Sequence, residues 1–292
     1  MNPKPVRKAI IAAAGYGTRF LPQTKAMPKE MLPVIDKPVI QLVVEEVVKA
    51  GVTDVIIVTG PTKRAIEDHF DRALELEEEL REKGKHAVAD TLQAIAEQAN
   101  FIYLRQKGLP KGNARPVLNA AHLIGDEPFL VFYGDDFFTG EIPRAQQLVE
   151  TYNQTGGSVI SLIEIDKKDA DKYGVVGVKE KLDDKVVKIS QIVEKPGAEA
   201  APSSFASVGG YLLTPDILPL IAEEQVGSNG ELNLSETIGR LAQQTDVYGR
   251  FIDGEYHDTG NPELYLQAVI DVALKDAKLG PELREYLHRK LK

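Results

Sequence analysis

Short apolar runs alternate along the first half of the chain with segments whose apolar residues recur at helical spacing. The run from Ala9 to Ala14 has the length and character of a buried strand. Similar runs predict strands at 54–60, 101–105 and 128–136, and the helical patterns predict helices at 39–50, 62–83 and 115–124. Because strands that alternate with helices favour a mostly parallel sheet covered on both faces, the predicted fold class is α/β. We expect a Rossmann-like, mixed and mostly parallel central sheet flanked by helices.

The predicted helix at 62–83 is heavily charged. Its apolar side chains are spaced for one buried face, and they are Ile66, Phe70, Leu74 and Leu80. The acidic run at 75–82 indicates a solvated surface and not a site.

The second half of the chain has a different texture. Short strand candidates at 158–165, 174–178, 186–193 and 208–213 are separated by charged turns, which indicates a mixed or antiparallel extension of the same sheet. The sequence contains neither a linker rich in proline, glycine or serine nor an internal repeat, so we expect one domain over residues 1–292. Helical patterns at 263–275 and 282–290 should pack across that domain or against another subunit.

The composition is that of an ordinary globular protein. Hydrophobic residues make up 43% of the 292 residues, and there are no cysteines, which fits a reducing compartment. No apolar stretch reaches the roughly 18 residues that a membrane span needs. The first five residues lack the apolar core of a signal peptide. We therefore expect a cytoplasmic protein with no membrane partner.

The charge is spread unevenly along the chain. Its formal net value is −9, which makes nucleic acid a poor partner for the surface as a whole. Residues 1–40, however, hold seven basic and two acidic side chains, a net charge of +5, which leaves −14 for the remainder. A basic segment inside an acidic protein suits a small polyanion, although a cluster of solvated lysines is the alternative.

A glycine-rich loop follows the first predicted strand. Gly15-Tyr16-Gly17 ends the apolar run, and Thr18, Arg19, Lys25 and Lys29 follow on a loop interrupted by prolines. Glycines let the backbone approach a ligand closely, successive free N–H groups bind anions, and nearby cations neutralise phosphate oxygens. The pattern predicts a nucleoside triphosphate site at the end of the first strand.

Two common phosphate-binding motifs do not match this loop. A dinucleotide-binding motif would continue to a third glycine and a helix, which the prolines at 22, 28 and 33 prevent. A Walker A loop would end in G-K-[ST], which is missing. What remains is G-x-G-T-R with lysines six and ten residues beyond the arginine.

This combination resembles the nucleotide-sugar pyrophosphorylases, and most closely the bacterial UTP–glucose-1-phosphate uridylyltransferases. The matching motifs are A-A-G-Y-G-T-R-F-L-P-Q-T-K-A-M-P-K-E-M-L-P at 13–33, A-I-E-D-H-F at 65–70, G-D-D at 134–136, Y-G-V-V at 173–176, V-E-K-P at 193–196, A-P-S at 201–203 and G-x-Y at 209–211. The resemblance is colinear from about residue 6 to about residue 270. It implies a nucleotidyltransferase of the glycosyltransferase-A-like fold.

The resemblance also implies a reaction, in which glucose 1-phosphate attacks the α-phosphorus of UTP to give UDP-glucose and pyrophosphate. Such a displacement needs alignment and charge neutralisation more than a covalent intermediate. By resemblance, the catalytic residues are Arg19 and Lys29 on the triphosphate and Lys195 on the sugar phosphate. The implied nucleotide-binding residues are Ala13, Ala14, Gly15, Gly17, Thr18, Gln106 and Gly112. The nucleotide-binding half would span about 1–140 and the sugar-phosphate half about 141–260, followed by C-terminal helices at about 261–292.

The implied metal is Mg²⁺, held by Asp135 and Asp258. For Asp258 the alternative is a turn-forming aspartate before Thr-Gly, and for the neighbouring Asp136 we expect a loop cap. The implied sugar-binding residues are Gly174, Glu194 and Gly209. Glu194 could instead form a surface pair with Lys195, and the glycines could be ordinary turn or bulge residues. We expect His257 to be a core or surface histidine.

The sequence departs from the family pattern at the nucleobase. Where the uridylyltransferases carry G-L-G-H-A, this chain has G-N-A-R-P at 112–116, and an arginine there could alter the base preference or add a phosphate contact. Similarly, E-L-N-L-S-E at 231–236 replaces E-I-Q-L-T-D, and Gly210 stands where arginine is common. Two alternatives therefore stay open: a transferase for dTTP or another sugar 1-phosphate, and a non-catalytic paralogue that binds nucleotide sugar. We expect a homodimer or homotetramer.

Overall fold

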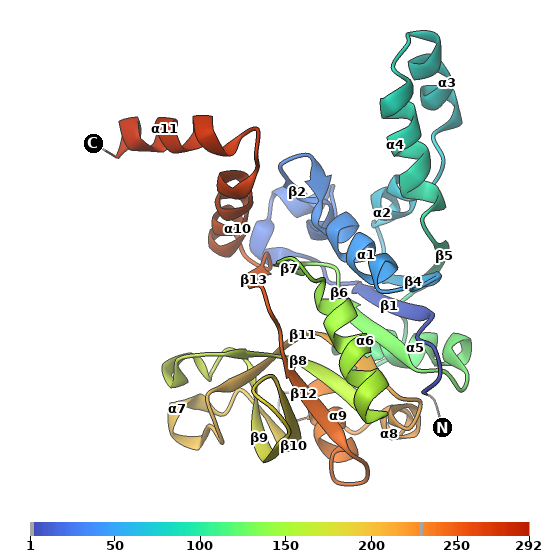
Figure 1. Ribbon diagram of the computed structural model, residues 1–292. Helices are drawn as coiled ribbons and strands as arrows, with labels where there is room; N and C mark the ends of the chain where they lie inside the picture. The colour runs from blue at the N-terminus through green and yellow to red at the C-terminus, as the bar shows by residue number, and fades with distance from the viewer. Residues whose placement is uncertain (1–2, 228–229, 292) are drawn as a thin grey trace.

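The computed structural model describes residues 3–227 and 230–291, so both ends of the predicted 1–292 domain lie outside the described residues. Its main sheet is built from β1 (Lys8–Ala13), β4 (Asp54–Thr59), β5 (Asn100–Arg105), β6 (Phe129–Tyr133), β8 (Ser158–Glu164), β9 (Gly174–Lys181), β10 (Val186–Glu194), β11 (Phe205–Leu213) and β12 (Val247–Phe251). The order across the sheet is β5-β4-β1-β6-β11-β8-β12-β10-β9 (Figure 1). The first four of these strands run parallel, and β11 runs antiparallel to β6. The mixed α/β sheet is confirmed, but among the described strands it is not mostly parallel. The first half is parallel, whereas the second half is antiparallel apart from the β8–β12 pair.

Helices cover both faces of this sheet. One face carries α1 (Val39–Lys49), α2 (Arg64–His69) and α6 (Arg144–Thr155), and the other carries α5 (Arg115–Ile124), α8 (Ile217–Ala222) and α9 (Leu234–Leu241). Successive side chains of β1 point to opposite faces of the sheet, so both faces need a covering layer. Ala9 and Ile11 pack with the first group of helices, and Ile10 packs with the second. A strand buried on both faces is apolar throughout, which is why its position could be predicted.

The predicted helix at 62–83 is wrong. The chain forms α2, a break, α3 (Leu74–Glu82) and then the unpredicted α4 (His86–Glu97). Phe70 is buried at the end of α2, whereas Leu74 is 59% exposed, so the two side chains do not share one buried face. Helices α3 and α4 pack against each other as a hairpin that projects from the body (Figure 1). The acidic run on α3 is solvated as expected, except for the buried Glu77, which pairs with Arg72.

Short elements connect these layers. They are the strands β2 (Pro33–Val34) and β3 (Lys37–Pro38), the helix α7 (Gly197–Ala200), and the 3-10 turns η1 (Thr18–Phe20), η2 (Gln23–Lys25), η3 (Lys29–Met31) and η4 (Lys167–Asp169). The predicted C-terminal helices are confirmed as α10 (Pro262–Lys275) and α11 (Gly280–Lys290). Helix α10 packs on the body through Ala268, beside Val34 and Phe137, whereas α11 extends outward (Figure 1). No helix of the described residues has both the length and the apolar character to cross a bilayer.

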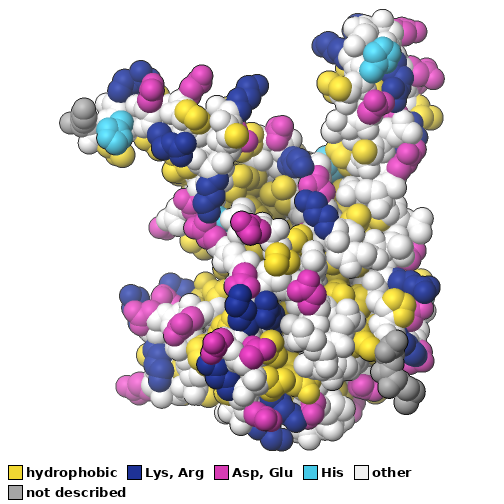
Figure 2. All heavy atoms as spheres, viewed as in Figure 1, with side chains coloured by type: hydrophobic (Ala, Val, Ile, Leu, Met, Phe, Trp, Pro, Cys, Tyr) yellow, Lys and Arg dark blue, Asp and Glu magenta, His cyan; other side chains and the backbone are white. Residues whose placement is uncertain are grey.

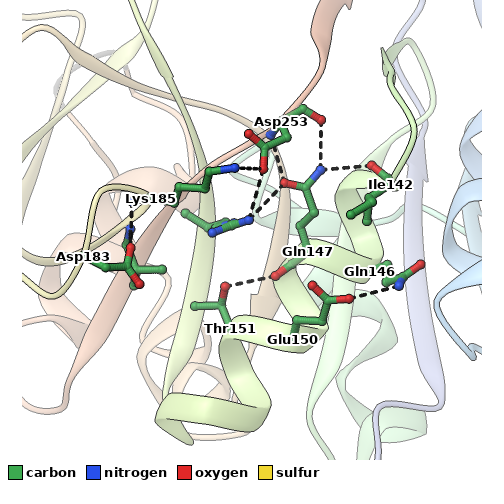
Figure 3. A network of polar contacts seen from close by, with 10 residues as sticks. Ile142, Gln146, Gln147, Glu150, Thr151, Asp183, Lys185 and Asp253 are labelled. Carbon is green, nitrogen blue, oxygen red and sulfur yellow. Dashed lines mark hydrogen bonds and ion pairs between the residues drawn. The ribbon is translucent and has the colours of Figure 1, made fainter.

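A small two-stranded ribbon of β7 (Asp136–Thr139) and β13 (Glu255–Asp258) stands beside the main sheet. Its antiparallel register places Asp258 opposite Asp136. The turn before β13 is held by the buried Gln147 of α6, whose amide donates to the Asp253 carbonyl at 3.0 Å and accepts from the Asp253 N–H at 2.9 Å (Figure 3). The ribbon thereby brings Asp258, from the last part of the chain, beside Asp136.

Arg144, at the start of α6, is fully buried between two carboxylates. Its guanidinium donates to Glu46 of α1 at 3.1 Å through both Nε and Nη2, and its Nη1 donates to Asp136 at 2.7 Å. The same Nη1 donates to the Gly209 carbonyl at 2.6 Å. Asp136 is therefore a buried ion-pair partner that begins β7, and the expectation of a loop cap is wrong. The turn comes earlier, because β6 ends at Tyr133.

One guanidinium cannot neutralise two buried carboxylates. Burial raises the pKa of Asp136 to about 6, despite the opposing effect of Arg144. Burial disfavours the charged guanidinium, but Glu46 and Asp136 outweigh it and raise the pKa of Arg144 above its ordinary value. The cation is thus held firmly, and removing it would leave two unpaired carboxyl groups in the interior.

We predict that Arg144→Leu lowers the free energy of unfolding by about 3–5 kcal/mol, since it breaks a buried network by removing the shared partner. Urea denaturation followed by circular dichroism measures this change. Glu150→Ala, an exposed position on the same helix, should change stability by less than about 0.5 kcal/mol. A loss below about 1 kcal/mol for Arg144→Leu would show that the network behaves like a surface pair.

Candidate active site

The loop after β1 folds back on the segment that carries Lys29. Ala13 is buried as the last residue of β1, and Ala14 and Gly15 follow it at the end of the strand. Gly17 has a φ of 64°, and a Cβ there would lie 3.1 Å from the Lys29 Cβ. Thr24 closes the loop, because its hydroxyl donates to the Gly17 carbonyl at 2.7 Å. A side chain at position 17 would push this loop away from the lysine.

Lys29 forms a direct ion pair with Asp135, which follows β6. Both side chains are largely buried, with 19% of each exposed. Burial disfavours the charged ammonium, but Asp135 and Glu30 outweigh it and raise the pKa of Lys29. The lysine therefore stays cationic at the junction between the β1 loop and the end of β6.

A second ion pair lies beneath this one. Glu30 is almost completely buried, and Lys63 donates to both of its carboxylate oxygens at 2.7 Å. Burial raises the pKa of Glu30 and lowers that of Lys63, with each partner opposing the shift of the other. The pair joins the segment of Lys29 to the segment after β4, so the loops at the ends of two neighbouring strands are held together.

A cleft of about 460 Å³ opens above these loops, at the carboxyl ends of the parallel strands. Of the residues predicted from the sequence, it is lined by Ala14, Gly15, Lys29, Gln106, Gly112 and Asp135. We refer to it as the nucleotide-side cleft. Ligand sites in open α/β sheets lie at this edge, where strand ends and loops converge.

A second cavity of about 250 Å³ lies across Asp135. Its lining includes the predicted residues Gly174, Glu194, Lys195, Gly209 and Asp258. We refer to it as the sugar-side cavity. The two spaces share Asn113, Tyr133 and Asp135, so they form adjoining parts of one site.

Two residues of the sugar-side cavity have distinctive geometry. Lys195 has a φ of 46°, and its N–H donates to the Tyr173 carbonyl at 3.0 Å. Such backbone strain in a non-glycine residue persists where the surroundings hold it, often at functional sites. A Cβ at Gly209 would lie 1.9 Å from the Asp136 carboxylate, so only glycine fits between this carboxylate and the cavity.

Asp135 and Asp258 meet at the edge of this cavity. Thr259 donates to the Asp135 carbonyl from both its N–H, at 3.0 Å, and its hydroxyl, at 2.7 Å. A Cβ built on Gly260 would lie 2.9 Å from Asp258 Oδ1 and 3.6 Å from Asp135 Oδ2, so an atom at that point is within reach of both carboxylates. Burial raises the pKa of Asp258, and Asp135 adds to this effect. Two carboxylates that share a small space fit a hard divalent cation.

The remaining predicted residues lie around the cleft and not in its lining. Ala13 is covered, Gly17 shapes the loop, and Thr18 lines a separate hollow beside Leu21 and Thr24. Arg19 is exposed, and its Nη1 lies 3.8 Å from the position of a Cβ on Gly260. Its guanidinium is therefore near Asp258, where it opposes the rise in the pKa of that carboxyl group.

Several lining residues were missed from the sequence. Lys111 lies over the ring of Tyr16, 5.2 Å from the ring centre, at the mouth of the nucleotide-side cleft. Ser235 lines the sugar-side cavity, and its hydroxyl donates to Glu194 at 2.7 Å. The departures from the family pattern at 112–116 and 231–236 were the sequence signal that could have identified Ser235, because these two segments meet at the site.

Arg115 and His257 are both buried. Arg115 is buried and directed away from the cleft, since it donates to the Pro110 carbonyl at 2.9 Å and to Glu224 at 2.8 Å. The suggested phosphate contact of Arg115 is therefore wrong, because its donors are used inside the protein. His257 is a core histidine, as expected, stacked on Phe137 with ring centres 4.9 Å apart.

Comparison with known proteins gives consistent matches along almost the whole chain. The nucleotidyl transferase family model matches residues 8–274. UTP–glucose-1-phosphate uridylyltransferase 2 of Staphylococcus saprophyticus is 46% identical over 287 residues, which cover 98% of each chain. The corresponding enzyme of Staphylococcus haemolyticus is 44% identical over 284 residues, which cover 97% of this chain and 98% of the relative.

Solved structures agree with these relatives. A UDP-glucose pyrophosphorylase complexed with UDP-glucose is 37% identical, with a TM-score of 0.83, and the match covers 93% of this chain and 100% of that one. A UTP-bound enzyme of the same name from Acinetobacter baumannii is 32% identical, with a TM-score of 0.87 and coverage of 97% and 99%.

Proposed function

The chain belongs to the nucleotidyl transferase family, and we propose that it transfers the uridylyl group of UTP to glucose 1-phosphate, giving UDP-glucose and pyrophosphate. The observation that carries this function is a pair of adjoining spaces that share Asp135, one beside a glycine-rich cationic loop and one beside Glu194 and Lys195. The relatives named above are uridylyltransferases, and two similar structures hold UTP and UDP-glucose.

The nucleotide-side cleft would hold UTP, with its triphosphate on the β1 loop. Backbone N–H groups at Ala14, Gly15 and Gly17 would bind phosphate oxygens, with Ala13 and Thr18 as the adjoining residues of the nucleotide-binding segment. Lys29 is the cation fixed at the junction of the two spaces, so it would stabilise charge on the α-phosphate as the new bond forms. Arg19 is exposed beside the loop and would draw charge from the leaving pyrophosphate.

Two residues on the far wall of the cleft would bind the base. Gln106 can both donate and accept, which suits the uracil edge. Gly112 has a φ of 141°, and a Cβ there would lie 2.3 Å from the Leu232 carbonyl oxygen, so the backbone at this position is closely packed and open to the ligand on its other side. Both residues line the cleft, which supports these assignments.

The sugar-side cavity would hold glucose 1-phosphate. Glu194 would accept hydrogen bonds from the glucose hydroxyls, and Gly174 and Gly209 would offer backbone contacts where a side chain would intrude. The ammonium of Lys195 would bind the phosphate and hold it in line with the α-phosphorus. We propose that residues 1–140 and 141–260 form the corresponding halves of one domain, followed by the C-terminal helices at 261–292.

We propose Mg²⁺ as the metal, held by Asp135 and Asp258. Among the described residues, no group of three or more histidine, cysteine or acidic side chains is arranged to hold a metal, so phosphate oxygens and water would complete its ligands. When bound, Mg²⁺ would neutralise charge on the phosphates and help to orient them. Lys29 would remain beside it, because the lysine is paired with Asp135.

The proposed function is tested by initial rates with a panel of nucleoside triphosphates and sugar 1-phosphates. We predict the highest kcat/KM for UTP with glucose 1-phosphate, with release of pyrophosphate. A pocket distinguishes uracil from thymine by one methyl group, worth about 1–3 kcal/mol, so dTTP should be used more slowly. Faster turnover of dTTP would contradict the base assignment. Ligand binding without pyrophosphate release from any pair would indicate the non-catalytic alternative.

Asp135→Asn removes the negative charge of one of the two carboxylates proposed to bind the metal. We predict a fall in kcat of more than about tenfold and a higher Mg²⁺ concentration for half-maximal rate, since an amide is a weaker ligand for a hard cation. Titration of Mg²⁺ into metal-free protein measures both quantities. Asp184→Asn, a fully solvent-facing position, is the matched control and should leave them unchanged. Wild-type activity of Asp135→Asn at ordinary Mg²⁺ would show that another residue holds the metal.

We also propose a cytoplasmic homodimer or homotetramer. The absence of cysteine supports a reducing compartment. Both arms of the molecule, the α3–α4 hairpin and the α10–α11 segment, carry exposed apolar side chains (Figure 2): Leu74, Leu76, Leu266 and Tyr286. Helix α3 is strongly acidic and the last turn of α11 is basic, so the arms of two copies are complementary in charge.

Light scattering should therefore give a mass of two or four times 32.1 kDa. Replacing Leu266 and Tyr286 together by aspartate should lower that mass, because the apolar contact of the arm is lost. A wild-type mass of 32.1 kDa would contradict the proposal.

A further inference from the structure

The first turn of α9 is capped by a residue far away in the sequence. The side chain of Asn233, which precedes the helix, makes no cap hydrogen bond. Instead, the amide oxygen of Asn113 accepts from the Leu234 N–H at 2.7 Å. A side-chain oxygen that satisfies a free N–H at a helix start fixes the position of the first turn. Asn113 thus holds the beginning of α9.

Backbone hydrogen bonds strengthen this contact. The Leu232 N–H donates to the Lys111 carbonyl at 2.8 Å, and the Ala114 N–H donates to the Leu232 carbonyl at 3.0 Å. Leu232 and Leu234 are both fully buried, so the segment is anchored on its apolar side as well. Residues 111–114 and 232–234 therefore behave as one unit that spans the nucleotide-side cleft and the sugar-side cavity.

The next residue of α9 reaches Glu194. The hydroxyl of Ser235 donates to Glu194 Oε2 at 2.7 Å, and the Lys195 ammonium lies 3.7 Å from Glu194 Oε1. Ser235 is buried, with 6% exposed, so its hydroxyl has little freedom to turn elsewhere. One carboxylate oxygen is thereby held by α9, and the carboxylate plane has one orientation toward the cavity.

We propose that Asn113 and Ser235 are positioning residues for the sugar phosphate, acting through Glu194. Asn113 fixes the first turn of α9, that turn places Ser235, and Ser235 orients the carboxylate. The inference rests on the proposed function, because glucose 1-phosphate is the ligand assigned to Glu194. Its consequence is specific: Asn113, which lines both spaces and lies in the segment that departs from the family pattern, governs the use of the sugar and not the choice of base.

Kinetics with one substrate varied at a time separate these roles. Ser235→Ala removes the hydrogen bond to the charged Glu194 carboxylate. Because bonds to charged groups are among the stronger ones, we expect the KM for glucose 1-phosphate to rise about tenfold, with the KM for UTP changed less than about twofold. Asn113→Ala should act in the same direction. Lys195→Ala removes a proposed direct contact to the sugar phosphate. Its effect on the KM for glucose 1-phosphate is the reference with which the two positioning variants are compared.

Conservative variants test the physical cause. Ser235→Thr keeps the hydroxyl, and Asn113→Asp keeps an acceptor oxygen where a helix start favours negative charge. Both should keep the KM for glucose 1-phosphate within about twofold of wild type. Thr237→Ala is the matched control on α9, because its hydroxyl donates to the carbonyl of Asn233, just before the helix, and not to Glu194. It should lower the melting temperature but leave both KM values unchanged.

Three results would overturn the inference. These are an unchanged KM for glucose 1-phosphate in Ser235→Ala, a larger effect of Asn113→Ala on UTP than on the sugar phosphate, and an equal rise in KM for Thr237→Ala. If Asn113→Ala does not fold, Ser235→Ala decides alone. A wild-type protein that forms no UDP-glucose would reject the proposed function instead, and calorimetric titration of glucose 1-phosphate into wild type and Ser235→Ala would then test the positioning role.

Discussion

The buried cation Arg144 joins the parts on which the site depends. Its guanidinium bonds to Glu46 of α1, to Asp136 of β7 and to the Gly209 carbonyl of β11. Asp136 follows the proposed metal ligand Asp135 directly and fills the space beside Gly209. The proposed metal carboxylate and the backbone of the sugar-side cavity are thus set by one buried ion network. A desolvated network of this kind tolerates little displacement, since leaving any of its charged groups unpaired in the interior lowers the stability of the fold.

The change from parallel to antiparallel pairing explains why two substrates can meet here. Parallel strands β1, β4 and β5 end in loops that form the nucleotide-side cleft, whereas β9, β10 and β11 of the antiparallel part supply residues to the sugar-side cavity. Asp135 follows β6, the last strand of the parallel group, and so lies at the boundary. The β7–β13 ribbon then brings Asp258 to the same boundary from the other end of the chain.

The sequence predicted what local patterns determine. Buried strands are continuously apolar, the β1 loop needs glycine and cations within a few residues, and α5 begins at Arg115 with proline in its first turn, so these elements were found. The sequence did not predict the break after Phe70. The apolar residues keep their helical spacing through this region, and the turn is imposed by tertiary packing. The buried role of Asp136 depends on Arg144 of another element, α6, which is in turn held by the distant Glu46. The buried role of Arg115 depends on Glu224, which is also distant in the sequence.

The central claim is that UTP and glucose 1-phosphate lie together in the two adjoining spaces and react directly. The stereochemical course at the α-phosphorus tests it most directly, using UTP in which sulfur replaces one α-oxygen in a single configuration. A direct in-line displacement predicts inversion of that configuration in the thio-substituted UDP-glucose, read by phosphorus NMR. Retention would require a covalent uridylyl-enzyme and would contradict the account.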